Sequence, residues 1–164
     1  MAREISAGGA VLRSIDGSWH VALIEPQKDT KPSGKTKPSA RKGTRAVLAL
    51  PKGLVDAGES PEATARREVQ EETGIRAEVV TKLADIKYVY TRTWSGGERV
   101  FKIVTFYLMR YVSGEIDDLA AEMRVEVKRA LWVPLAEAGR QMAYSSERSV
   151  LRQAQRRAEG VASG

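Results

Sequence analysis

The sequence of 164 residues contains no cysteine and a single histidine, His20. These two shortages exclude disulfide bridges, a cysteine nucleophile, cysteine-based zinc sites and a metal centre built from clustered histidines. The remaining metal-binding and acid–base groups are mostly carboxylates, which are hard oxygen donors and suit Mg²⁺ or Mn²⁺. If the chain holds a metal ion, we expect it to be one of these two.

Long apolar runs are also missing. The uninterrupted apolar run over residues 46–50 is far shorter than the about 20 residues that cross a bilayer. Residues 1–5 lack the apolar core of a signal peptide. We therefore expect a cytoplasmic, soluble protein with no membrane partner, and the length predicts one domain over residues 1–164.

Positive charge is abundant but is confined to one segment. The chain has a net charge of +6, and residues 26–45 account for all of it, with seven Lys and Arg side chains against Asp29. This segment lacks large apolar residues, so it cannot bury enough surface to offset the entropy of ordering. We predict a basic, mobile loop inserted into the domain. It could anchor nucleic acid, but a flexible linker is the favoured interpretation.

The rest of the chain alternates between strand-like and helix-like segments. Turn residues predict two hairpins, one joining 5–13 to 19–25 and one joining 78–94 to 99–111. Ser60 as a cap, Pro61 at the first position and Gly74 at the end predict a helix over 60–73. Further strands are predicted at 46–50 and 130–133, and further helices at 135–142 and 147–159.

Three carboxylates share one side of the helix predicted over 60–73. At 100° per residue, Glu68, Glu71 and Glu72 cover an arc of about 100°. Repulsion between solvated glutamates costs only a few tenths of a kcal/mol per pair. The cluster by itself is therefore also compatible with an ordinary wetted surface.

A longer pattern surrounds these glutamates. Residues 53–75 fit G-x5-E-x7-R-E-U-x-E-E-x-G-U, in which U is aliphatic. All nine fixed positions are filled, by Gly53, Glu59, Arg67, Glu68, Val69, Glu71, Glu72, Gly74 and Ile75. A chance match in a chain of this length is on the order of 10⁻⁷ or rarer. On these residues the chain resembles the Nudix (MutT-like) hydrolases, and segments 50–53, 131–135 and 144–148 are similar to bacterial members.

This resemblance implies an α/β fold, the Nudix α/β/α sandwich, in which a mixed β-sheet lies between helices. It also implies that Glu68, Glu71 and Glu72 bind Mg²⁺, with Mn²⁺ as a substitute, helped by the backbone carbonyl of Lys52. Such ions would activate a water molecule and neutralise the charge that develops at phosphorus.

Two further residues of the pattern are expected to support the ligands. Arg67 lies four residues before Glu71 and is expected to pair with it. Glu59 is expected to orient Arg67 or a water-bound ligand.

Members of the family often add a carboxylate from outside the pattern, as a metal ligand or general base. Glu126, six residues before Trp132, is the favoured candidate, and Glu122 is the alternative. A solvated acidic loop explains either residue equally well. The other candidates, all less favoured, are Glu115, Asp117 and Asp118.

In relatives, aromatic and basic side chains border the substrate cleft, where rings stack on a base and lysine meets phosphate. The resemblance implies such contacts for Lys52, Tyr88, Lys102 and Tyr144. Core packing is an equally good interpretation of the last three, and it is the favoured one for Tyr107.

The predicted substrate is a nucleoside or dinucleoside polyphosphate. Residues 50–53 resemble diadenosine polyphosphate hydrolases, whereas 144–151 resemble enzymes that hydrolyse 8-oxo-guanine nucleotides. Diadenosine tetraphosphate is favoured over 8-oxo-guanine nucleotides, an RNA 5′-triphosphate end and diphosphoinositol polyphosphates. A non-catalytic nucleotide- or RNA-binding module is the alternative of another class, and the complete set of carboxylates disfavours it.

Overall fold

The computed structural model describes residues 2–27 and 47–162. Its strands are β1 (Ala2–Ile15), β2 (Ser18–Pro26), β3 (Lys52–Leu54), β4 (Ile75–Arg92), β5 (Glu98–Gly114) and β6 (Val127–Pro134). Its helices are α1 (Pro61–Thr73), α2 (Leu135–Gln141), α3 (Ser145–Arg156) and α4 (Ala158–Ala162), with 3-10 turns η1 (Thr93–Ser95) and η2 (Ala121–Val125). In the part of the chain described, no helix has the length and apolarity to cross a membrane.

The six strands form one mixed sheet. The order is β4-β5-β1-β2-β6, with β3 added to β1 beside residues 6–8. β1 runs parallel to β5, whereas the β1–β2, β1–β3, β2–β6 and β4–β5 pairs are antiparallel. Strand β1 is therefore the central strand of the sheet. Its partner strands come from both halves of the sequence.

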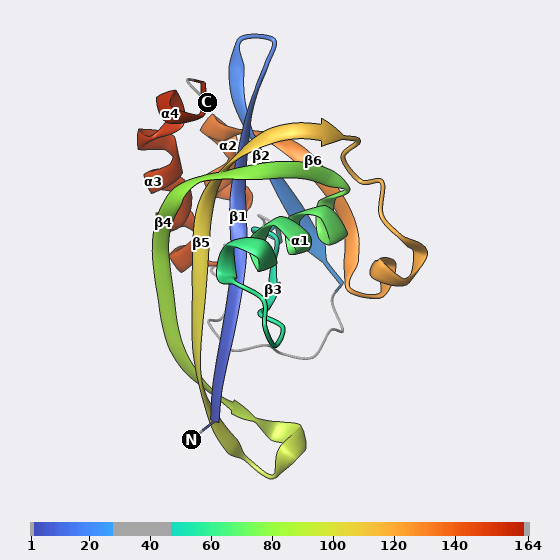
Figure 1. Cartoon of the computed structure of the whole chain (residues 1–164), viewed down its shortest axis with the longest axis vertical. Coiled ribbons are helices and arrows are strands. Elements are labelled where there is room, and N and C mark those ends of the chain that lie inside the picture. Colours follow the sequence, from blue (N-terminus) through green and yellow to red (C-terminus); the bar gives the residue numbers. More distant parts are fainter. Residues whose placement is uncertain (1, 28–46, 163–164) are drawn as a thin grey trace.

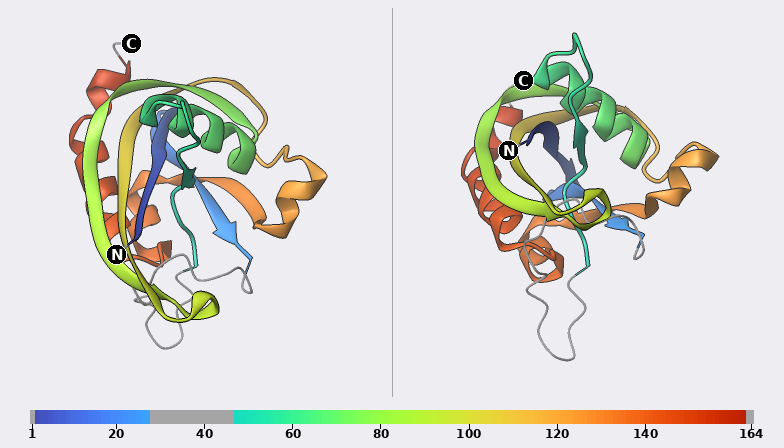
Figure 2. Two further views of the ribbon diagram at one scale, coloured as in Figure 1. Left: turned by 60° about the horizontal axis from the view of Figure 1, so that its bottom comes forward. Right: turned by 90° about the horizontal axis from the view of Figure 1, so that it is seen from below.

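Helices cover the sheet on opposite sides (Figures 1 and 2). On one face, Ala65 and Val69 of α1 pack with Ala7, Val11 and Met109 of β1 and β5. On the other face, α2, α3 and α4 supply buried side chains to a larger core. These are Leu135, Ala138, Val150, Leu151, Ala154, Ala158 and Val161. The predicted α/β/α sandwich is confirmed.

Both predicted hairpins and the helix over 60–73 are confirmed. The first turn places Asp16 and Gly17 at φ of 50° and 81°, the backbone that an Asp-Gly hairpin turn requires. The helix predicted at 147–159 differs from the structure. Helix α3 starts at Ser145, and the helix is interrupted at Arg157 before α4 begins.

The strand predicted at 46–50 is wrong for its described residues, 47–50. Leu48 and Ala49 form only isolated bridges, to Met142 and Ile24. The next residue, Leu50, donates its backbone N–H to a side chain, and Pro51 has no N–H to donate, so no ladder forms. The predicted loop over 26–45 lies outside the described residues, apart from Pro26, which ends β2, and Gln27.

Candidate active site

Helix α1 holds the glutamates in place because both of its ends and one of its faces are fixed. Ser60 Oγ accepts a hydrogen bond from Ala63 N at 3.1 Å, and Gly74 ends the helix at φ 86°. A Cβ on Gly9 of β1 would overlap the Met109 side chain and lie 3.2 Å from Val69, so only glycine lets α1 approach the sheet this closely.

Arg67 connects the loop before α1 with the glutamates on it. Its Nε and Nη2 donate to the two Glu59 oxygens at 2.8 and 2.9 Å. Its Nη1 donates to Glu68 at 2.8 Å and to Glu71 at 3.1 Å, and Nη2 also reaches the Leu54 carbonyl at 3.1 Å. The expected contacts of Arg67 with Glu71 and with Glu59 are therefore both present.

The hydrogen bonds between Arg67 and Glu59 favour the charged form of both side chains. Hydrogen bonds from Arg67 and then Thr64 hold the pKa of Glu59 at about 2. In return, the hydrogen bond to Glu59 and the charge of Glu68 outweigh burial and raise the pKa of Arg67. Two nitrogens of Arg67 bond the two oxygens of Glu59, and this bidentate geometry fixes the orientation of Arg67.

The pKa values of Glu68 and Glu72 are raised, in contrast to that of Glu59. Burial, followed by the charge of Glu68, raises the pKa of Glu72 to about 8. Burial also raises the pKa of Glu68, against the opposing effect of Arg67. The side chain of Glu71 is 42% exposed. A buried carboxylate, Glu72, beside a half-buried one, Glu68, that repels it is a typical environment for binding a cation.

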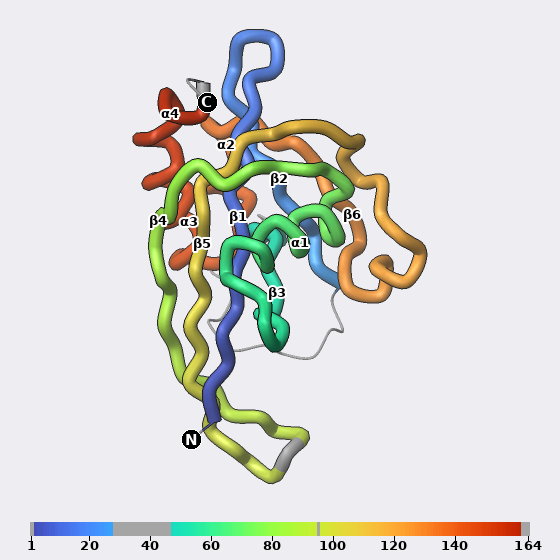
Figure 3. Tube along the Cα trace, in the orientation of Figure 1, coloured from blue at the N-terminus to red at the C-terminus, as the bar shows by residue number. Residues whose placement is uncertain are grey.

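Strand β3 lies beside α1 (Figure 3), and its backbone contacts the carboxylates of that helix. Lys52 N donates to Glu72 Oε1 at 3.0 Å. A Cβ on Gly53 would overlap the Glu68 carboxyl group, so a larger residue here would displace that carboxylate. The predicted role of the Lys52 carbonyl as a metal ligand stays a prediction.

The donor set fits a hard divalent cation in its chemistry, because every candidate ligand is an oxygen. In the ranges 2–27 and 47–162, however, no group of three or more His, Cys, Asp or Glu side chains is arranged to hold one ion. In this structure Arg67 donates to oxygens of Glu68 and Glu71, and Lys52 N donates to an oxygen of Glu72.

The carboxylates outside the pattern differ in what they contact. The charge of Glu126, at the end of η2, contributes to the raised pKa of both Glu68 and Glu72, so this residue lies near them. Asp117 accepts hydrogen bonds from Arg124 Nη1 and Ala130 N, each at 2.8 Å, which is a structural task. Glu122 is exposed on η2. The role of Glu126 as a ligand or base stays a prediction.

The predicted substrate residues Lys52, Tyr88 and Lys102 affect one another electrostatically. Burial raises the pKa of Tyr88 to about 12, and the charge of Lys52 opposes that rise. Burial and then the charge of Lys52 lower the pKa of Lys102, whose ammonium lies 3.8 Å from Glu4. These groups therefore share one face of the sheet. Tyr144 precedes the first residue of α3, and its predicted contact with the substrate stays a prediction.

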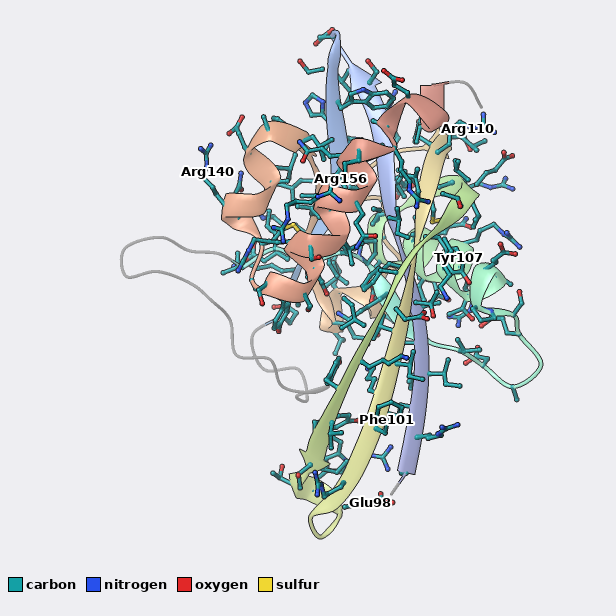
Figure 4. The ribbon with its side chains drawn as sticks, turned by 90° about the vertical axis from the view of Figure 1, so that its left-hand side faces the viewer. Glu98, Phe101, Tyr107, Arg110, Arg140 and Arg156 are labelled. Atoms are coloured by element: carbon teal, nitrogen blue, oxygen red, sulfur yellow. The ribbon has the colours of Figure 1, made fainter. Side chains whose placement is uncertain are left out.

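Two other tyrosines have packing roles. Tyr107 is 7% exposed and belongs to the core under α1, as expected; Figure 4 shows it on the α1 side of the sheet. Tyr90 is also buried, and its hydroxyl donates to Glu4 Oε1 at 2.7 Å. Glu4 was not expected from the sequence, because its partners Arg92 and Lys102 lie on strands that are 88 or more residues away in the chain.

Glu147 is the other residue that sequence reasoning missed. It is 4% exposed, and its Oε1 accepts from Leu50 N at 2.8 Å while Oε2 lies 3.3 Å from Lys52 Nζ. A signal exists in the sequence: Glu147 occupies the position three residues before Val150 and four before Leu151, on the apolar stripe of α3. A charged residue on such a stripe needs a buried partner.

Comparison with known proteins agrees with the fold. The NUDIX domain model matches residues 9–154. The chain is 40% identical over 147 residues to a Mycobacterium tuberculosis protein that carries the name mutator protein MutT4, covering 88% of this chain and 52% of that protein. It is 31% identical over 103 residues to an 8-oxo-(d)GTP phosphatase of Mycolicibacterium smegmatis, covering 63% of this chain and 28% of the phosphatase. The chain thus spans about half the length, or less, of these two relatives.

Solved structures show the same architecture. A MutT NUDIX hydrolase from Burkholderia pseudomallei superposes with a TM-score of 0.64 at 24% identity, covering 93% of this chain and 98% of that one. An Ap4A hydrolase from C. elegans gives a TM-score of 0.62 at 22% identity, covering 96% and 98%. At these identities the likeness concerns the fold.

Proposed function

Because this chain belongs to the NUDIX domain family, we propose that it is a MutT-type hydrolase which cleaves a phosphoanhydride bond of a nucleoside or dinucleoside polyphosphate. The observation that carries the proposal is the pairing of the buried carboxylate of Glu72 with the half-buried carboxylate of Glu68: burial raises the pKa of both groups, and a bound cation would stabilise both as carboxylates. Glu71 at the rim completes the set of glutamates on this face of α1.

The residues of the chain have distinct tasks in this proposal. Glu68, Glu71 and Glu72 would hold Mg²⁺, or Mn²⁺ in its place, which when bound activates water and neutralises phosphate charge. Glu59 fixes Arg67, and Arg67 keeps Glu68 and Glu71 oriented. Glu126 is proposed as the additional ligand or general base.

The substrate side of the proposal rests on Lys52, Lys102 and Tyr88. Two ammonium groups on one face favour a chain of phosphates, and the half-buried ring of Tyr88 offers a surface on which a base could stack. Tyr144 is proposed as a second ring contact. The likeness to an Ap4A hydrolase fold and to an 8-oxo-(d)GTP phosphatase supports both substrate types, and diadenosine tetraphosphate is our first choice.

A substrate screen tests the proposal. The full chain is incubated with Mg²⁺ and diadenosine tetraphosphate, nucleoside triphosphates including 8-oxo-GTP, 5′-triphosphate RNA or diphosphoinositol polyphosphate, and the products are identified by mass spectrometry. We expect turnover of diadenosine tetraphosphate or a nucleoside triphosphate that is lost with EDTA. Turnover only of RNA or inositol substrates would overturn the substrate class, and no turnover at all would favour a binding module.

A further inference from the structure

One buried carboxylate on α3 binds two residues of the segment that leads into β3. Glu147 accepts from Leu50 N through one oxygen and pairs with Lys52 Nζ through the other. A buried carboxylate is costly unless its oxygens have donors, and here each oxygen has one. Glu147 therefore ties the start of α3 to the backbone beside the glutamates of α1.

Lys52 lies between this carboxylate and the candidate metal site. Its backbone N–H donates to Glu72 Oε1 at 3.0 Å, whereas its ammonium reaches Glu147 Oε2 at 3.3 Å. Although burial alone would lower the pKa of Lys52, the charges of Glu147 and, to a smaller extent, Glu72 raise it. The ammonium thus has two carboxylates in range and is bonded to Glu147.

The choice between these two carboxylates matters for cation binding. A lysine side chain is long and flexible, and after Glu147 the carboxylate whose charge acts most strongly on the ammonium is Glu72. An ammonium paired with Glu72 would neutralise that carboxylate and compete with a divalent cation for its oxygens.

We propose that Glu147 is a positioning residue that holds the Lys52 ammonium away from Glu72 and so leaves the Glu72 carboxylate available to a divalent cation. This inference rests on the proposed function, because it takes Glu72 to be a metal ligand. Glu147 acts through Lys52 and itself contacts neither metal nor substrate.

Metal affinity without substrate is the direct test. Mn²⁺ binding is measured by electron paramagnetic resonance of the free ion for wild type, Glu147→Gln, Lys52→Met and the double variant. Glutamine still accepts from Leu50 N but no longer attracts the ammonium, so we expect Glu147→Gln to bind Mn²⁺ about 10-fold more weakly. In the double variant the competing ammonium is gone, and affinity returns to near the wild-type value.

The rescue separates this role from a purely structural one. If Glu147 only stabilised the fold, Glu147→Gln and the double variant would lose affinity equally, and that result would overturn the proposal. So would unchanged affinity in Glu147→Gln. Glu137→Gln, an exposed glutamate on the neighbouring α2, is the matched control and should bind Mn²⁺ as wild type does.

Lys52→Met provides a second test that leaves Glu147 in place. Removal of the ammonium should leave Mn²⁺ affinity equal to or above that of wild type, and weaker binding would contradict the proposal. The proposed function fails separately, if wild type binds Mn²⁺ with this pattern but hydrolyses none of the nucleotides in the screen.

Discussion

At the scale of single residues, the candidate site depends on close approach between a backbone and a carboxylate. Gly53 in β3 leaves room for the Glu68 carboxyl group, and a side chain there would overlap it. Arg67 holds the same carboxylate from the other side at 2.8 Å. The position of Glu68 is therefore set by two neighbours, only one of which carries a side chain.

Gly53→Ala tests this arrangement. The added Cβ must displace Glu68, so we expect kcat to fall by about 10-fold or more while the overall fold persists. Steady-state kinetics and circular dichroism measure the two effects. Gly139→Ala on α2 is the control, because nothing lies within 4 Å of its added Cβ and its kinetics should not change.

Glu71→Gln and Glu72→Gln test the ligands themselves. Each removes a charge at constant shape, so we expect metal-dependent turnover to fall by at least about 100-fold with the fold intact. In Glu72→Gln the side chain still accepts from Lys52 N, which preserves the local structure. Glu62→Gln, exposed in the first turn of α1, is the control. Unchanged activity in both test variants would refute the mechanism.

At the scale of elements, the segment between β5 and β6 is fixed by Asp117. Its backbone N–H donates to the Thr73 carbonyl at the end of α1 at 2.8 Å, and its carboxylate holds Arg124 and Ala130 N. These contacts link the end of α1 to η2 and β6. They determine where Glu126 lies relative to the glutamates of α1.

Asp117→Asn should loosen this link. Asparagine tolerates the φ of 74° but cannot form the ion pair with Arg124, so unfolding should become easier by on the order of 1 kcal/mol at pH 7. Urea denaturation measures the change. Asp118→Asn, exposed and next in sequence, should have no measurable effect.

The effect of Asp117→Asn on the free energy of unfolding should depend on pH. Hydrogen bonding to Arg124 lowers the pKa of Asp117, so its stabilising effect is complete above the unfolded pKa of about 4 and is lost as pH falls through the lower folded value. The difference in unfolding free energy between wild type and Asp117→Asn should therefore shrink below about pH 4. A difference that stays constant down to pH 2 would contradict the assignment.

At the scale of the whole molecule, charge and fold are separable. The chain outside residues 26–45 has no net charge. The backbone closes across the ends of this segment, since Ile24 and Ala49 exchange hydrogen bonds of 2.9 and 2.8 Å. The sheet can thus be completed without the basic residues.

Replacement of residues 28–45 by a short Gly-Ser linker tests what the basic segment does. If it is a linker, nucleotide turnover should stay within about twofold of wild type, and binding to RNA or DNA should not change. Filter binding at several salt concentrations measures the second effect. A salt-sensitive affinity that disappears with the deletion would show instead that the segment anchors nucleic acid.

The local pattern predicted much of the molecule correctly. The hairpin turns, the limits of α1 and the common face of Glu68, Glu71 and Glu72 all follow from residues close together in the chain. The strand predicted at 46–50 is wrong for its described residues because the donors and acceptors of a segment find partners anywhere in the fold. Here a side chain of α3 accepts the hydrogen bond of the Leu50 N–H.

The sequence by itself therefore determined the helix that carries the carboxylates and the hard-ligand chemistry that the scarcity of cysteine and histidine leaves. Both depend on composition and on spacing within a few turns of backbone. Only the tertiary structure decided that Glu147 pairs with Lys52, that Lys102 faces Glu4, and that Asp117 is engaged by Arg124. Burial and the packing of helices, strands and connections create these partnerships, and neither the spacing of residues nor their periodicity specifies them.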